Sequence, residues 1–421
     1  MLRNLLSTTA SRLIIALINL GIIWICARYL GAEILGTISL IVLGISIIQL
    51  VTAVLAGSAL VYQTSRNSLA ELLIIAWIWI AVAGVPVWLI LRAFSLIPEG
   101  FGTDVLVLAI LGSMITVNQN IFLGKEKVNW FNALAVLQSL LILLPLLIFV
   151  LIGNWYNTQA YVTAQYISMS SMAMVGVWVN FPSLKDFRWP RMSIVMESFS
   201  YGGYLQAANF LQLFNYRLSY YIIEKFFDRA TLGVFSVGVQ IAESVWIIGR
   251  SMAVLLFSRI SNSRDHNYSV LLTVQFIKLT GLITIALLVV LMLLPTDFFV
   301  WVFRSDFNNI KQVIISLAPG IVAVSLSMMF SHYFSGTGKP KYNTISSLIG
   351  LVFTLILGFT IIPLYGLAGA GLTSSISYLS GTIYQIVIFM TLTHVKWRGF
   401  IPDRADIDLA LKQVKDMFAK S

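Results

Sequence analysis

The sequence predicts an all-α polytopic membrane protein with about twelve transmembrane helices, on the evidence of its composition, its apolar runs and its charge distribution. Of 421 residues, 58% are hydrophobic and only 10% are charged, and the mean hydropathy is +0.89. A soluble domain carries roughly 25% charged residues, so most of this surface must face lipid. Because each span takes about 20 apolar residues, twelve spans leave no room for a large extramembrane domain.

The apolar runs place the expected spans along the chain. Each should be an α-helix, because a segment inside hydrocarbon must satisfy its own backbone hydrogen bonds. The expected spans are about 10–30, 36–62, 69–91, 105–123, 130–152, 160–180, 204–226, 233–260, 271–294, 312–334, 344–364 and 368–392. We expect four regions: an N-terminal six-helix bundle (1–180), a cytoplasmic amphipathic linker (181–203), a C-terminal six-helix bundle (204–392) and a cytoplasmic interfacial tail (393–421).

The linker and the tail each combine charge with an apolar helical face. In the linker, a basic turn around Lys185 and Arg188 precedes an apolar stretch at 192–199, which predicts a short helix lying on the cytoplasmic leaflet. In the tail, Ile407, Leu411 and Phe418 share one face of a helix at 403–420. Both segments are therefore expected at the membrane surface.

The distribution of Lys and Arg predicts the orientation. If the N-terminus is cytoplasmic, the inside segments hold about three times as many Lys and Arg residues as the outside ones, in accord with the positive-inside rule. We therefore expect both termini in the cytoplasm. The net charge of +10 reflects this bias, and no nucleic-acid partner is expected.

Two short matches indicate that the halves are a duplication. Leu35–Ser39, which reads LGTIS, resembles Leu232–Ser236, which reads LGVFS. Gly124–Asn129 (GKEKVN) resembles Gly338–Asn343 (GKPKYN) in the corresponding loop of the second half. Both matched loops lie on the same side of the membrane as their counterparts, so the two bundles should be related by a parallel repeat.

Polar and ionisable residues inside the spans are the candidates for function, because burying them in a membrane is costly. In the seventh span Gln206, Asn209, Arg217 and Tyr220 fall on one stripe of the helix, and in the eighth Glu243 and Arg250 lie two turns apart near Gln240. We expect these residues to line a water-filled cavity between the halves, with Arg12 at its mouth. Two alternatives stay open: Arg217 and Glu243 form a buried structural ion pair, or Arg12 only anchors the topology.

Glu243 is the one carboxylate placed well away from both membrane surfaces. A carboxylate at that depth, close to arginines, is a candidate for coupling transport to protons or sodium. This hypothesis rests on the depth of Glu243 within the predicted span.

Several motifs that would indicate an enzyme or a motor are absent from the sequence. There is no phosphate-binding Gly-rich loop, no His-Glu-x-x-His, no nucleophile elbow and no cluster of carboxylates that would hold a metal. The single Cys26 excludes a disulfide within the chain. We therefore expect a protein without catalytic activity, cofactor or metal.

Four stretches are similar to polysaccharide flippases of the Wzx type. They are Cys26–Gly36, with the pattern R-x-L-G-x-x-x-x-G; Leu232–Val237 followed by Ile241–Glu243; Tyr333–Asn343; and Ile362–Ala370. Their order and spacing extend across nearly the whole chain. The sequence thus resembles the multidrug/oligosaccharidyl-lipid/polysaccharide exporter superfamily.

The resemblance implies a function and a location. It implies two six-helix bundles working by alternating access, which move undecaprenyl-diphosphate-linked repeat units of O-antigen (lipopolysaccharide) or capsule across a bacterial inner membrane. The partners that the resemblance implies are the lipid-linked oligosaccharide, membrane lipids and a polysaccharide polymerase complex. It also implies a cationic cavity, for which Arg217 and Arg250 are suitable because arginine binds phosphate through two parallel hydrogen bonds.

Two other functions compete with this one. A related exporter of drugs or small cations should carry acids in its cavity where this chain has arginines. A membrane polysaccharide polymerase or ligase would typically have a large outside loop, whereas the longest ones expected here, about 92–104 and 295–311, are short.

Overall fold

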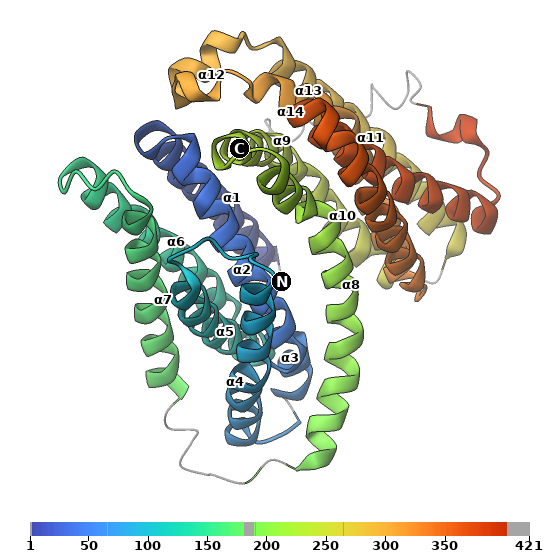
Figure 1. Ribbon diagram of the computed structural model, residues 1–421. Coiled ribbons are helices and arrows are strands. Elements are labelled where there is room, and N and C mark those ends of the chain that lie inside the picture. The colour runs from blue at the N-terminus through green and yellow to red at the C-terminus, as the bar shows by residue number, and fades with distance from the viewer. Residues whose placement is uncertain (1, 65, 181–188, 190, 264, 402–421) are drawn as a thin grey trace. The chain divides into compact units, whose positions relative to one another are not determined.

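The described part of the chain contains helices and no strands, as the apolar runs predict. The computed structural model describes residues 2–64, 66–180, 189, 191–263 and 265–401 (Figure 1). The longer helices are α1 (Leu2–Ile25), α2 (Ala32–Ala56), α4 (Leu69–Ala93), α5 (Gly102–Gly124), α6 (Val128–Leu151), α7 (Thr158–Asn180), α8 (Met192–Phe226), α9 (Arg229–Ser244), α10 (Trp246–Ser261), α11 (His266–Leu293), α13 (Ile310–Gly336) and α14 (Lys341–Thr393). Shorter helices are η1 (Cys26–Leu30), α3 (Ser58–Thr64), α12 (Thr296–Phe303), η3 (Ser305–Phe307) and η4 (Trp397–Phe400).

Two predicted features fall outside the described residues. These are the basic turn around Lys185 and Arg188 in the linker and the amphipathic tail helix at 403–420.

The helices account for about twelve crossings of a membrane. Eight are long and apolar enough to span by themselves, and the bent pair α9 and α10 adds a ninth. The helix α14 is 53 residues long, about 80 Å at 1.5 Å per residue, which is enough for two spans. The more polar helices α7 and α8 have 23 and 35 residues and are long enough to span as well. The predicted fold class is confirmed.

The break that divides α14 lies at Gly366. Its backbone angles, φ 54° and ψ −128°, are non-helical and strained for a residue with a Cβ. The sequence predicts separate spans at 344–364 and 368–392, and the break falls between them.

The eighth predicted span is bent. It consists of α9 and α10, whose axes differ by 42° across Val245. At the bend the Val245 amide donates to the Ala242 carbonyl at 3.3 Å, one residue closer than in an α-helix. The sequence contains no proline or glycine at this point that would have predicted the bend.

The helix α8 begins before the predicted seventh span. It is continuous from Met192 to Phe226, where the sequence analysis expects a separate short helix followed by a span from residue 204. Gly202 and Gly203 are both helical, so the chain does not break there. Near its start, Arg191 Nη2 lies 3.3 Å from Oε2 of Glu71 on α4.

The same helix ending follows α5 and α13, in support of the repeat. In the first, the Lys127 amide donates to the Phe122 carbonyl at 2.9 Å, and in the second the Lys339 amide donates to the Phe334 carbonyl at 2.7 Å. The residue before each donor is left-handed, Glu126 at φ 59° and Gly338 at φ 74°. Both are Schellman endings. In backbone conformation Gly338 therefore corresponds to Glu126. The sequence match between GKEKVN and GKPKYN instead aligns Gly338 with Gly124, two residues earlier.

The chain divides into two compact units. The first unit consists of Met1–Leu213, Phe227–Ser236 and Val300–Phe307. The second consists of Phe214–Phe226, Val237–Phe299 and Asn308–Ser421. The division passes through α8 and α9, so parts of both helices belong to each unit.

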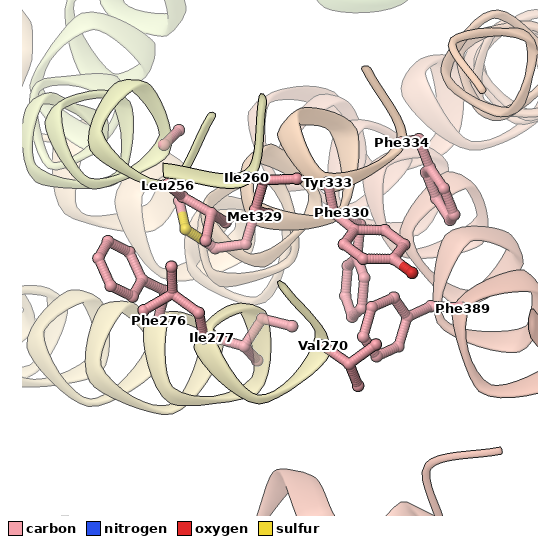
Figure 2. Packing of buried hydrophobic residues seen from close by; sticks show 12 residues of the cluster. Leu256, Ile260, Val270, Phe276, Ile277, Met329, Phe330, Tyr333, Phe334 and Phe389 are labelled. Atoms are coloured by element: carbon pink, nitrogen blue, oxygen red, sulfur yellow. The ribbon is translucent and has the colours of Figure 1, made fainter. Parts of the chain in front are cut away.

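The core of the second unit is rich in aromatic residues. One cluster brings together α10, α11, α13 and the end of α14, and Figure 2 shows Phe330, Tyr333 and Phe389 facing one another within it. The rings of Tyr333 and Phe389 are 4.8 Å apart and those of Phe330 and Phe389 are 5.3 Å apart. Edge-to-face contacts of this kind fix the packing of α13 against α14.

Candidate functional site

Arg217 and Glu243 form a two-pronged ion pair inside the second unit. Arg217 comes from α8 and Glu243 from α9. Nη1 and Nη2 of the arginine donate to Oε1 and Oε2 of the glutamate, each at 2.7 Å. The two side chains are only 24% and 13% exposed. This geometry uses both carboxylate oxygens and is among the strongest that a charged pair can adopt.

Aromatic side chains of the second unit lie close to the pair. The guanidinium carbon of Arg217 is 5.4 Å from the centre of the Tyr220 ring, a distance at which a cation is attracted to the ring face. Tyr216 packs against Trp246 at 5.5 Å and against Tyr378 at 5.1 Å. Trp246 and Tyr378 are buried, so Tyr216, Trp246 and Tyr378 form a packed aromatic shell in the same unit as the pair.

The pair has consequences for the charge of the site. A carboxylate and a guanidinium that are bonded to each other contribute no net charge. The contact expected by the ion-pair alternative is thus present in the structure. The predicted role of Arg217 and Tyr220 in lining a cavity stays a prediction.

Arg250 is the exposed cation next to this shell. It lies on α10, one turn beyond Trp246, with its guanidinium carbon 6.0 Å from the Trp246 ring. Among the described residues it makes no salt bridge with a carboxylate. Gln240 is half-buried on α9. The 42° bend at Val245 lies between Glu243 and Arg250, so the two residues do not lie on one straight helix, and their common role stays a prediction.

The other predicted site residues lie in the first unit. On α8, Asn209 Nδ2 donates to Gln206 Oε1 at 3.0 Å, and Gln206 is 8% exposed. Arg12 is exposed on α1. The structure therefore joins Gln206 to Asn209 and Arg217 to Glu243 and Tyr220, while their contribution to a shared cavity stays a prediction.

Sequence reasoning missed a buried polar network beside Arg217. Asn215 on α8 accepts through Oδ1 from Thr354 Oγ1 at 2.8 Å and from Ser377 Oγ at 2.5 Å, both on α14. A methyl group on Gly350 would lie 2.5 Å from Asn215 Nδ2, so this glycine gives the amide its room. The network therefore connects α8, close to where the second unit begins at Phe214, with the parts of α14 before and after the break at Gly366. No spacing in the sequence indicates these partners, which are far apart in the chain.

Comparisons with known proteins agree with this architecture. A model of the family described as lipid II flippase MurJ matches residues 224–410. A solved structure of lipid II flippase MurJ in an inward closed conformation is similar over 100% of this chain and 92% of its own, with a TM-score of 0.73 and 15% identity. An inward-facing multidrug resistance MATE family transporter of the MOP superfamily gives a TM-score of 0.70, with 16% identity over 92% of this chain and 100% of its own.

Two further comparisons concern archaea. A MOP superfamily transporter from Pyrococcus furiosus has a TM-score of 0.65 and 18% identity, covering 93% of this chain and 94% of its own. An uncharacterized membrane protein of Methanocaldococcus jannaschii, MJ1068, is 24% identical over 289 residues. That match covers 66% of this chain and spans 56% of the length of the relative. At these identities the likeness establishes the fold alone, which this chain shares with the solved structures named above.

Proposed function

We propose that this chain is a flippase that moves an undecaprenyl-diphosphate-linked oligosaccharide repeat unit from the inner to the outer leaflet of a bacterial inner membrane. The observation that carries the proposal is the match of residues 224–410 to the lipid II flippase family, within a transporter fold that extends over the whole chain. The matched segment contains Glu243 and Arg250. The product would serve O-antigen or capsule synthesis, with a polymerase as the enzyme that consumes it.

The chemistry of the described residues supports a diphosphate cargo. A diphosphate with attached sugars does not cross hydrocarbon unaided, because unpaired charge there costs several kcal/mol or more. Arg250 is an exposed guanidinium without a carboxylate partner among the described residues. A guanidinium binds phosphate oxygens through parallel hydrogen bonds and stays charged in a membrane.

The Arg217–Glu243 pair provides a means of coupling. While the two are bonded, Glu243 balances the charge of Arg217 and takes one N–H group on each of its two Nη atoms, which weakens its hold on an anion. A proton or a sodium ion on Glu243 would release the guanidinium and allow it to join Arg250 in holding the diphosphate. In this proposal Glu243 is the ion-coupling residue and Arg217 is the second cationic contact.

A cellular experiment tests the proposed function. In a strain lacking this protein, lipid-linked single repeat units should accumulate with their sugars on the cytoplasmic face, out of reach of a periplasmic glycosidase. Restoring the chain should return them to the outer face. A deletion strain that displays single units outside would instead indicate a polymerase, and an unchanged surface glycan with lost drug resistance would indicate a drug exporter.

Drug export is the second candidate, because solved MATE family transporters share the fold. The described membrane-depth charges weigh against it. Glu243 is neutralised by Arg217, and Arg250 adds a positive charge that would repel cationic drugs.

A further inference from the structure

Gly36 on α2 and Gly233 on α9 form a reciprocal backbone contact inside the first unit. A Cβ added to Gly36 would lie 2.8 Å from the carbonyl carbon of Arg229, and one added to Gly233 would lie 2.7 Å from that of Ala32. Both distances are shorter than van der Waals contact, so each helix runs against the bare backbone of the other. Only glycine allows so close an approach.

The contact has the symmetry of the sequence repeat. Each glycine touches the carbonyl group of the residue four positions before the other glycine, Ala32 before Gly36 and Arg229 before Gly233. These glycines are the ones paired by the matching segments LGTIS and LGVFS. The duplicated motif therefore packs against its own copy across an approximate twofold axis, which gives the repeat a structural role.

Two side chains secure the same end of the first unit. Trp24 Nε1 donates to the Val302 carbonyl at 2.9 Å and Arg28 Nη1 donates to the Trp301 carbonyl at 3.2 Å. Next to them, Gly31 has φ 88°, and a Cβ there would lie 3.3 Å from Oδ2 of Asp306. Thus α1, η1 and α2 hold two segments from later in the chain, 227–236 and 300–307.

Both segments are short arms of elements that continue into the second unit. The division falls after Ser236 within α9 and before Val300 within α12. Neither glycine brings a side chain of its own into the contact, and the bonds of Trp24 and Arg28 end on main-chain carbonyls. Opening the contact therefore separates bare backbone at the two glycines and breaks two hydrogen bonds to the main chain.

We infer that this contact is a latch on the outer side of the membrane, which must part each time the chain releases its cargo outward. We call it the outer latch and define it as Trp24, Arg28, Gly36, Gly233 and the main chain at 301–302. The positive-inside bias places these residues outside. The inference rests on the proposed function, because only an alternating passage needs an outer closure that opens.

The test measures how readily a reagent reaches the latch. Cys26, the single cysteine, is replaced by alanine, and Ala32, which is 4% exposed at the contact, is replaced by cysteine. Right-side-out vesicles are treated with a membrane-impermeant maleimide in the absence of substrate. Adding Gly233→Ala should raise the labelling rate at least tenfold, because its methyl group forces the helices apart. Gly36→Ala should do the same.

A matched control separates the latch from a general effect of alanine in a helix. Gly203 on α8 has nothing within 4 Å of an added Cβ, so Gly203→Ala should leave labelling at the background rate. If Gly233→Ala prevents folding, Trp24→Phe removes the indole hydrogen bond but keeps an aromatic ring, and it should raise labelling about threefold.

Each outcome decides the inference. Unchanged labelling in folded Gly233→Ala and Trp24→Phe proteins, or labelling confined to inside-out vesicles, overturns it. Because no substrate is added, the result does not depend on the cargo. Fast labelling together with no movement of lipid-linked saccharide leaves the latch standing and removes the proposed function. Unchanged labelling together with normal movement of the lipid-linked saccharide overturns the outer latch and leaves the proposed function in place.

Discussion

Arg217 and Glu243 are joined by two parallel hydrogen bonds of 2.7 Å between helices α8 and α9. The carboxylate thereby occupies one pair of parallel N–H donors that arginine would otherwise offer to a phosphate. This relationship links the stability of the second unit to its proposed chemistry, because the bonds that hold α8 to α9 must change when Arg217 engages an anion.

Removing one partner of this pair should destabilise the protein more than removing both. Arg217→Leu or Glu243→Leu leaves one charge without its partner in a poorly solvated place, at a cost of about 3 kcal/mol. The double variant leaves no unpaired charge and should recover most of that loss. Thermal unfolding in detergent measures all three. A double variant that is as unstable as the sum of the two single variants would show that the pair contributes no coupling energy.

Glu243→Gln should remove the dependence of transport on an ion gradient. Glutamine keeps the shape of the side chain but carries no charge, so it holds Arg217 less tightly whatever the ion gradient. Transport by the wild type should respond to an imposed proton or sodium gradient, while Glu243→Gln should run at a rate independent of either. If the variant still responds to the gradient, the coupling group lies elsewhere. Asp297→Asn, at an exposed acid on α12, serves as the control.

Arg250→Ala should reduce transport without reducing stability. The side chain is exposed, and its guanidinium lies over the Trp246 ring, so its loss leaves no buried polar group without a partner. We expect at least a tenfold fall in the translocation rate, with partial recovery in Arg250→Lys, because lysine keeps the charge but loses the two-pronged geometry. Arg259→Ala on the same helix is the matched control. Equal rates in the two alanine variants would remove Arg250 from the site.

The Asn215 network should contribute measurably to stability. Thr354→Val removes a hydroxyl group that donates to Asn215 at 2.8 Å and leaves a buried acceptor with one bond fewer. The expected loss is about 1–3 kcal/mol. Thr360→Val is the control, because that exposed hydroxyl bonds only to its own helix, at 3.0 Å from the Ile356 carbonyl. The difference in unfolding temperature between the two variants measures the contribution, and no difference would mean that water or another group replaces the lost bond.

The parts of the fold that depend on local pattern could be predicted from sequence. Apolar runs gave the spans, and the turn at Gly366 falls where two runs meet. The bend at Val245 could not be predicted, because a turn tightened by one hydrogen bond has no marker residue. The continuity of Met192–Phe199 with the seventh span could not be predicted either. The apolar face of a helix on the membrane surface has the same sequence pattern as that of a spanning helix.

The site was predictable in part for a similar reason. The cost of charge in a membrane marks Arg217, Glu243 and Arg250 as candidates from the sequence alone. The pairing of the first two was one of the open alternatives and is present in the structure. The partners of Asn215 come from α14, more than a hundred residues away in the chain. The glycine contact shows the same limit: the repeat marks Gly36 and Gly233, but only the fold brings them together.

The most direct test of the account is translocation by the purified protein in proteoliposomes. A polyprenyl-diphosphate-linked oligosaccharide, lipid II and ethidium are offered separately, and the fraction of each lipid that becomes accessible to an external glycan-specific probe is followed over time. We predict rapid movement of the oligosaccharide lipid, slower movement of lipid II and no transport of ethidium. Transport of ethidium while both diphosphate lipids stay in place would contradict the account.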